Sequence, residues 1–149
     1  MIKNIKKVAV LGSGIMGSGI ACQLANVGLE VILLDIISEN EKNSSNPRKR
    51  NNLVNNALNT AVKSKPAPLY SKSMLNNITT GNFDDDFEKI SNCDWIIEVV
   101  VERLEIKNVI FEKVDQHRKV GSIVSSNTCG IPINSMLKNR TDDFTSHFL

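Results

Sequence analysis

A glycine-rich turn near the start of the chain most constrains how it can fold. Three glycines stand in the spacing GxGxxG within the segment Gly12, Ser13, Gly14, Ile15, Met16 and Gly17. Before this turn, residues 8–11 form a short continuous apolar run, which is typical of a strand buried on both faces. After it, apolar residues recur at helical spacing up to Gly28, and a second apolar run covers residues 31–34. Strand, turn, helix and strand within about 30 residues predict a βαβ unit.

Each glycine in this spacing has a physical reason. Gly12 permits a tight turn, Gly14 lets the backbone approach a pyrophosphate, and Gly17 allows the helix to pack closely on the strand. The helix that follows directs its free N–H groups and the positive end of its dipole at the phosphates. A purely structural glycine turn is the alternative, but the order of strand, turn, helix and strand favours a dinucleotide site.

Asp35, at the end of the second apolar run, indicates which dinucleotide would bind. A carboxylate there can accept hydrogen bonds from the adenosine ribose hydroxyls, whereas it would repel a 2′-phosphate. The residues that follow it, Ile36, Ile37 and Ser38, supply no arginine for such a phosphate. We therefore expect NAD(H) rather than NADP(H) as the cofactor.

The rest of the chain continues to alternate between apolar runs and helical patterns. We expect further strands at residues 78–80, 95–101 and 121–125, and the opening of another strand at residues 144–149. We expect helices at residues 53–65, 106–114 and 131–137. We expect residues 38–52 to be a solvated loop, with residues 48–50 as its charged face. We expect residues 84–86 to be carboxylates at the start of a helix rather than a metal site. The pattern predicts an α/β protein, a Rossmann-type doubly wound parallel sheet with helices on both faces.

Composition excludes several other classes of protein. The 149 residues correspond to one domain or to part of a larger one, and a net charge of +2 argues against a dedicated nucleic-acid binder. The two histidines and the cysteines Cys22, Cys93 and Cys129 have no zinc-site spacing. An odd, widely spaced set of cysteines indicates reduced thiols and a cytoplasmic location. No apolar run approaches the roughly 20 residues that span a bilayer.

Polar residues follow two of the expected strands, where a doubly wound sheet places its ligand. Glu102 and Lys107 follow the strand at 95–101, and residues 126–129, with the sequence SNTC, follow the strand at 121–125. From the residues alone, Glu102 and Lys107 could equally be a surface ion pair, and SNTC a plain capping turn.

Three segments together resemble a known family. VAVLGSGIMGSGIA, WIIEVVVERLEIKNVIF and SNTCGIPI are similar to the NAD-binding domain of the L-3-hydroxyacyl-CoA dehydrogenases, especially the fused hydratase and dehydrogenase enzymes of fatty-acid β-oxidation. The resemblance implies that residues 12–17 hold the pyrophosphate and that Asp35 holds the adenosine ribose. It also implies that Glu102 and Lys107 contact the cofactor near its nicotinamide half and that Asn127 borders that pocket.

The resemblance also implies a reaction and its partners. The family transfers a hydride from C3 of an L-3-hydroxyacyl-CoA to NAD, and its members form dimers. Cys129 stands where the family has its catalytic serine, which makes it the candidate catalytic and substrate-contacting residue. A thiol donates a weaker hydrogen bond than a hydroxyl, so polarisation of the substrate oxygen should suffer.

The family's catalytic histidine lies in an HFxNP segment slightly beyond the position of His147. We therefore expect His147 to be a surface or strand residue, and residues 1–149 to be an incomplete NAD-binding Rossmann domain. The helical C-terminal domain, which carries the family's dimer interface, would be absent, and the chain alone would turn over little or no substrate. Two alternatives remain: a non-catalytic NAD(H)-binding module and another NAD-dependent hydroxyacid dehydrogenase.

Overall fold

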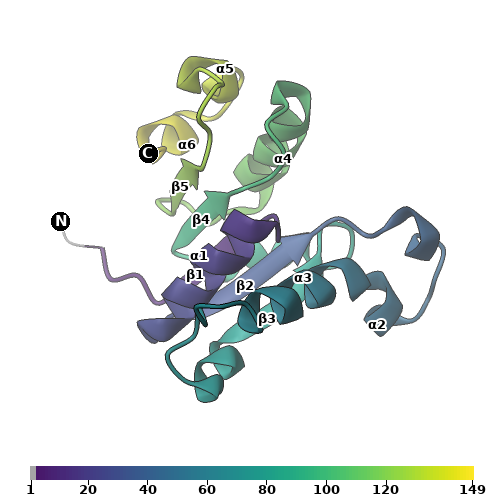
Figure 1. Cartoon of the computed structure of the whole chain (residues 1–149). Coiled ribbons are helices and arrows are strands. Elements are labelled where there is room, and N and C mark those ends of the chain that lie inside the picture. Colours follow the sequence, from purple (N-terminus) through teal and green to yellow (C-terminus); the bar gives the residue numbers. More distant parts are fainter. Residues whose placement is uncertain (1–2) are drawn as a thin grey trace.

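Five parallel strands form one sheet in the order β3-β2-β1-β4-β5 (Figure 1). The computed structural model describes residues 3–149. The strands are β1 (Lys7–Leu11), β2 (Glu30–Asp35), β3 (Ile78–Asn82), β4 (Trp95–Glu98) and β5 (Ile123–Ser126). In the centre, Val8 of β1 pairs with Val31 of β2 on one side and with Trp95 of β4 on the other. This strand order is that of a doubly wound nucleotide-binding sheet, which confirms the expected fold class.

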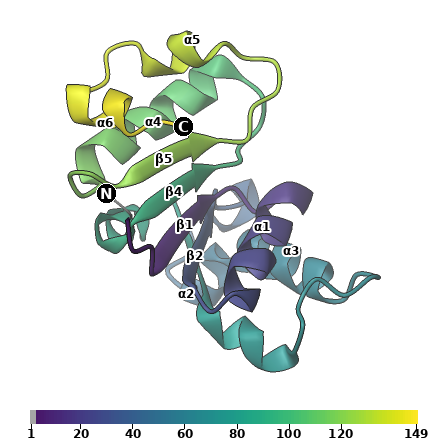
Figure 2. The ribbon, with the colours of Figure 1, turned by 90° about the vertical axis from the view of Figure 1, so that its left-hand side faces the viewer.

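Helices cover both faces of the sheet because its central strand is apolar on both faces. Val8 and Val10 pack toward α1 (Ile15–Asn26) and α3 (Asn52–Val62). Ala9 and Leu11 belong to the opposite cluster, over which the remaining long helix and the C-terminal helices lie (Figure 2). These are α4 (Leu104–His117), α5 (Ile133–Leu137) and α6 (Asp142–Ser146), with the 3₁₀ helix η3 (Phe87–Asn92) beside them. Among residues 3–149, none of the helices is both long and apolar enough to cross a membrane.

Two glycines of the predicted turn are required by close packing. Gly12 has φ +112°, and a Cβ atom there would lie 2.6 Å from the carbonyl oxygen of Val99. A Cβ atom on Gly17 would lie 1.8 Å from the carbonyl oxygen of Gly12. The start of α1 can therefore approach β1 and the end of β4 only where side chains are missing. Gly28 follows α1 with φ +85°, as expected for a residue just beyond a helix.

Several predicted boundaries differ from those observed. β4 ends at Glu98 rather than at residue 101, because the Glu98 carboxylate accepts a hydrogen bond from the Val100 N–H and the chain leaves the sheet there. The expected loop at residues 38–52 contains two short helices, η1 (Glu39–Glu41) and α2 (Pro47–Arg50). The Asn46 side chain caps α2, with Pro47 in its first turn. A further 3₁₀ helix, η2 (Lys72–Asn77), precedes β3.

Two charged segments, residues 48–50 and residues 84–86, pair with each other. Arg50 Nε lies 2.6 Å from Asp85 Oδ2, and Arg50 Nη2 lies 2.9 Å from Asp85 Oδ1. The hydrogen bonds from Arg50, followed by the hydrogen bond from Asn82, lower the pKa of Asp85 to about 2. The carboxylates at residues 84–86 do precede a helical segment, η3. Within residues 3–149, no group of His, Cys, Asp and Glu side chains is arranged to hold a metal ion.

The strand expected to open at residues 144–149 begins only after a helix, at residues 147–149. Phe144 lies in α6, where Thr141 accepts a hydrogen bond from the Phe144 N–H as the helix cap. Thr141 followed by two aspartates is a helix-start signal, and it overrides the apolar residues that follow. Residues 147–149 then lie along the sheet edge. Phe148 forms a parallel bridge to Val124, whose N–H donates to the His147 carbonyl oxygen (3.0 Å) and whose carbonyl oxygen accepts from the Leu149 N–H (2.9 Å).

Candidate active site

A groove of about 640 Å³ lies at the carboxyl ends of the strands. It opens where β1 leads into α1 on one face of the sheet and β4 leads toward α4 on the other face. The glycine turn at residues 12–17, Asp35 and Asn127 line it, together with apolar side chains that include residues 99–101. Every cofactor residue predicted from the sequence, except Glu102 and Lys107, therefore borders one groove.

The first turn of α1 faces this groove with free backbone donors. The first bond from α1 back to the preceding turn runs from the Ser18 N–H to the Gly14 carbonyl oxygen, 2.9 Å. The N–H groups before Ser18 have no acceptor in the helix. A Cβ atom built on Gly14 would meet no atom within 4 Å, so the space in front of these donors is open. Open space, free N–H groups and the helix dipole fit the pyrophosphate of a dinucleotide.

Asp35 is tied to the same turn. Its Oδ2 accepts hydrogen bonds from the Ser13 N–H (2.7 Å) and the Ser13 hydroxyl (2.5 Å), and its Oδ1 accepts from the Ile36 N–H (2.7 Å). A carboxylate offers about four acceptor sites, so one remains for a ligand hydroxyl. The link from Asp35 to Ser13 was not predicted from the sequence, and the position of Ser13 between two glycines was the signal for it.

Lys107 lies inside the molecule rather than on its surface. Its side chain is 0% exposed, and its Nζ lies 2.8 and 3.0 Å from the two carboxylate oxygens of Glu98 and 3.2 Å from Glu102 Oε2. The alternative of a surface pair is therefore wrong for Lys107. Glu98 shares a strand face with Ile96, toward α4, and Lys107 lies in the first turns of that helix. A glutamate within the apolar run WIIEVVV was the signal that could have identified Glu98.

Glu102 holds the turn that follows β5. Its Oε1 accepts hydrogen bonds from the Thr128 hydroxyl, the Gly130 N–H (3.1 Å) and the Cys129 N–H (3.3 Å). The hydrogen bond from Thr128, followed by that from Gly130 and the contact with Lys107, lowers the pKa of Glu102 to about 2. The predicted segment SNTC is thus held by a carboxylate from the neighbouring strand end.

The three thiols of the chain differ in access. Cys129 is exposed, whereas Cys22 and Cys93 are buried. Burial raises the pKa of Cys22, and it raises the pKa of Cys93 to about 11. Cys129 is therefore the accessible thiol of the chain.

Neither histidine is among the residues that line the groove. His147 caps α6, and its Nδ1 lies 2.7 Å from the Asp143 carbonyl oxygen. His117, at the end of α4, packs edge-on against Phe87 at a centroid distance of 5.6 Å.

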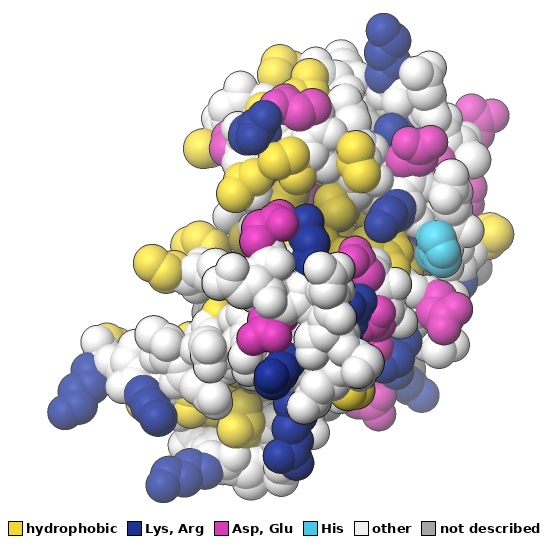
Figure 3. Space-filling view, turned by 90° about the vertical axis from the view of Figure 1, so that its right-hand side faces the viewer, with side chains coloured by type: hydrophobic (Ala, Val, Ile, Leu, Met, Phe, Trp, Pro, Cys, Tyr) yellow, Lys and Arg dark blue, Asp and Glu magenta, His cyan; other side chains and the backbone are white. Residues whose placement is uncertain are grey.

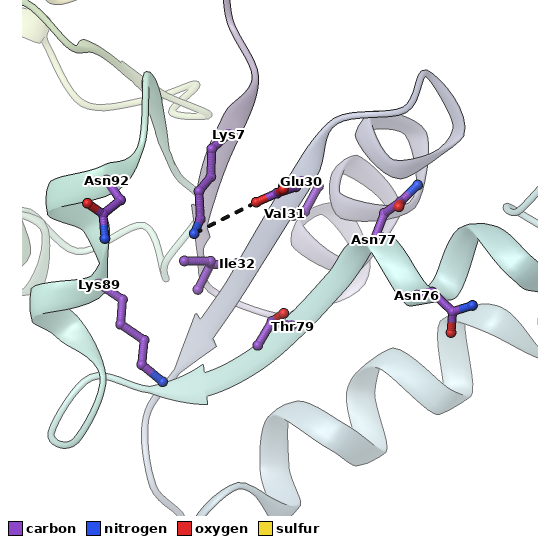
Figure 4. A pocket seen from close by; sticks show the side chains of 9 residues that line it. All are labelled: Lys7, Glu30, Val31, Ile32, Asn76, Asn77, Thr79, Lys89 and Asn92. Atoms are coloured by element: carbon purple, nitrogen blue, oxygen red, sulfur yellow. Dashed lines mark ion pairs between the residues drawn. The ribbon is translucent and has the colours of Figure 1, made fainter.

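A second hollow of about 420 Å³ lies at the amino ends of β1 and β2 (Figure 4). Its lining is polar, and its charged groups form surface pairs. Lys7 Nζ lies 3.9 Å from Glu30 Oε2, and Lys89 Nζ lies 2.6 Å from Asp86 Oδ1. Surface pairs of this kind contribute little free energy, and none of the site residues predicted from the sequence lines this hollow.

Comparisons with known proteins give close relatives. The chain is 54% identical over 159 residues to a probable 3-hydroxyacyl-CoA dehydrogenase of Bacillus subtilis and 43% identical to a putative fatty acid oxidation complex trifunctional enzyme of Rickettsia felis. Each match covers 100% of this chain and 20% of the relative, so the chain spans about a fifth of their length. A crystal structure of 3-hydroxybutyryl-CoA dehydrogenase from Escherichia coli superposes with a TM-score of 0.68 at 26% identity, covering 95% of this chain and 28% of that one.

The family itself is established by a match along almost the whole chain. Residues 7–149 match the sequence model described as 3-hydroxyacyl-CoA dehydrogenase, NAD binding domain. This confirms the resemblance drawn from the three sequence motifs and the expectation of NAD as the cofactor. The chain belongs to the family of NAD-binding domains of the 3-hydroxyacyl-CoA dehydrogenases.

Proposed function

We propose that the chain binds NAD(H) in the groove at the carboxyl edge of the sheet. The pyrophosphate would lie at the first turn of α1, and the adenosine ribose would donate a hydrogen bond to Asp35. Glu102 and Asn127 would border the nicotinamide half. The observation that carries this proposal is the open space before the free N–H groups of α1, in the same groove as the Asp35 carboxylate.

In the full-length protein, this site would serve the oxidation of L-3-hydroxyacyl-CoA to 3-ketoacyl-CoA. When bound, the nicotinamide supplies the acceptor for the hydride that leaves C3 of the substrate. The chain's own residues bind and orient: the α1 N–H groups neutralise phosphate charge, and Asp35 fixes the ribose. Apolar residues at 99–101 and Ile106 line the groove and would shield the bound nicotinamide from water.

Cys129 is the proposed contact to the substrate oxygen. Its thiol donates a weaker hydrogen bond than the serine hydroxyl of the family, so it should polarise the substrate less. In the full-length enzyme, Cys129→Ser should raise kcat for a 3-hydroxyacyl-CoA several-fold, measured by NADH absorbance. Cys22→Ala, which removes a buried thiol elsewhere, is the control. Unchanged or lower turnover in Cys129→Ser would overturn this role.

We further propose acyl-CoA as the substrate of the full-length protein, a dimer as its assembly, and the cytoplasm as its location. The free thiols favour a reducing compartment. No nucleic-acid partner is proposed: Figure 3 shows Lys and Arg along the lower rim of one face, with acidic and basic side chains alternating over the rest. The net charge of +2 supports the same choice.

The binding proposal is tested by titrating the chain with NADH and with NADPH while following nucleotide fluorescence. NADH should bind at least tenfold more tightly, because Asp35 repels a 2′-phosphate. Asp35→Asn should weaken NADH binding and reduce this preference, while Glu30→Gln, at the opposite end of β2, should change neither. Equal affinity for the two nucleotides contradicts the assignment.

The full-length protein then separates the alternatives. Reduction of NAD by 3-hydroxyacyl-CoA supports the proposed reaction, and reduction by a free hydroxyacid alone would show another dehydrogenase. NADH binding without turnover of either substrate would show a non-catalytic module.

A further inference from the structure

The ammonium group of Lys107 is buried and surrounded by carboxylates. Lys107 Nζ donates hydrogen bonds to both carboxylate oxygens of Glu98 and forms an ion pair with Glu102 Oε2 at 3.2 Å. Its side chain is fully buried. In this structure, Lys107 therefore acts on the site through the two carboxylates that it contacts.

Glu102 connects this buried charge to the turn after β5. One of its oxygens, Oε2, faces Lys107, and the other, Oε1, accepts from the backbone or hydroxyl donors of residues 128–130. Glu102 is partly exposed, with 37% of its side chain accessible. A half-exposed carboxylate would sample several rotamers without a partner behind it, and Lys107 supplies that partner.

Glu98 fixes Lys107 in turn. Its Oε1 accepts from Lys107 and from the Val100 N–H (2.7 Å), and its Oε2 accepts from Lys107 and from the Ser126 hydroxyl. The Glu98 carbonyl oxygen also accepts from the Asn127 N–H, 2.9 Å. Glu98 is fully buried and bonded on both oxygens, so it is the fixed end of this chain of contacts.

We infer that Glu98 and Lys107 are positioning residues that fix Glu102 and, through it, the turn at residues 128–130 that carries Cys129. The inference rests on the proposed function insofar as this turn directly follows Asn127, which lines the cofactor groove. The net charge of the three side chains is −1, so the remaining negative charge is held at Glu102 by attraction to a buried ammonium. Displacement of a reacting group by about 1 Å can cost a hundredfold in rate, so such a support has a catalytic use.

The test removes both buried charges together. In Glu98→Gln/Lys107→Met, neither partner is left as an unpaired buried charge, so the fold should survive. Glu105→Gln is the matched control, because it removes a carboxylate from the same helix that pairs only with exposed Arg103. The readout is amide hydrogen exchange at Cys129 and Gly130, with Val10 in the central strand as the probe of global unfolding.

We expect exchange at Cys129 and Gly130 to become at least tenfold faster in the double variant, with Val10 and the control variant unchanged. Rates within twofold of the original protein would overturn the inference. If the double variant does not fold, Glu98→Gln alone is measured instead. A tenfold faster exchange then supports the inference, and a rate within twofold of the original protein overturns it.

A second readout separates positioning from a merely structural role. The titration midpoint of the Glu102 carboxyl, followed by ¹³C NMR, should rise in the double variant and stay unchanged in Glu105→Gln; an unchanged midpoint in both would overturn the inference. Both measurements are made without NADH. Failure of the proposed function would appear only in the nucleotide titration, and failure of this inference only in the exchange and carboxyl data.

Discussion

The two walls of the groove are built from different materials. The wall at residues 12–17 consists of backbone N–H and carbonyl groups, with Asp35 attached by hydrogen bonds to Ser13. The opposite wall is lined by apolar residues 99–101 and by Asn127, and it is supported by three charged side chains, two of them fully buried, that hold the turn at residues 128–130. The first wall tolerates a substitution only where there is room for a Cβ atom, and the second only where the buried charges remain paired. Substitutions should therefore damage them in different ways.

The largest effect is expected where a buried charge loses its partner. Lys107→Met leaves the fully buried Glu98 carboxylate without its ammonium, and breaking a buried pair in this way costs about 3–5 kcal/mol of the free energy of unfolding. Removing both charges in Glu98→Gln/Lys107→Met should recover most of this loss. Urea denaturation measures both. Arg103→Met, which breaks an exposed pair with Glu105, should cost less than about 1 kcal/mol. Equal losses in the single and double variants would show that charge pairing is not the cause.

On the backbone wall, two glycines should separate stability from binding. Gly17→Ala places a Cβ atom 1.8 Å from the Gly12 carbonyl oxygen. The backbone shift that relieves this clash should lower the free energy of unfolding by about 3 kcal/mol. Gly14→Ala meets no atom within 4 Å and has φ −59°, so the free energy of unfolding should change by less than about 1 kcal/mol. It should nevertheless weaken NADH binding, because the new methyl group enters the space proposed for the pyrophosphate. Denaturation and NADH titration of both variants test this, and a stable Gly17→Ala would contradict the packing argument.

The difference between the walls also explains what the sequence could predict. A backbone site needs glycines at fixed spacing, so the turn at residues 12–17, Asp35 at the end of β2 and the left-handed Gly28 were all visible as local patterns. The alternation of apolar runs and helical stripes likewise predicted the parallel sheet.

Side-chain networks leave weaker local signals. Whether Lys107 points inward depends on where α4 begins and how it packs on β4, and this is a tertiary property that the spacing to Glu102 does not contain. The link from Glu102 to residues 128–130 crosses 26 residues of chain. At the C-terminal end, the apolar residues Phe144 and Phe148 indicated a strand, but the Thr141 cap and tertiary packing placed Phe144 in a helix.

The smallest expected effect is a local response to acid on the charged wall. The pKa of Glu102 is lowered from 4.5 to about 2, first by the hydrogen bond from Thr128. Its carboxylate therefore stabilises the turn fully above pH 4.5, and this contribution is lost as the pH falls through about 2. Thr128→Val removes the largest cause, so the Glu102 midpoint should move back toward 4.5 and the Cys129 and Gly130 amides should lose protection at higher pH.

Carboxyl ¹³C titration and amide exchange at each pH would measure this shift. A local probe is needed because the pKa values of Asp85 and Asp94 are also lowered to about 2. Protonation of these carboxylates therefore destabilises other parts of the fold over the same pH range. The hydrogen bond from the Gly12 N–H to the Leu34 carbonyl oxygen, 2.7 Å, contains no group that titrates there. Its protection should follow global unfolding alone, with the same pH dependence in Thr128→Val as in the original protein. If Gly12 and Gly130 instead lost protection together in both proteins, the two walls would open as one unit and the Glu102 carboxylate would have no separate role in holding the turn.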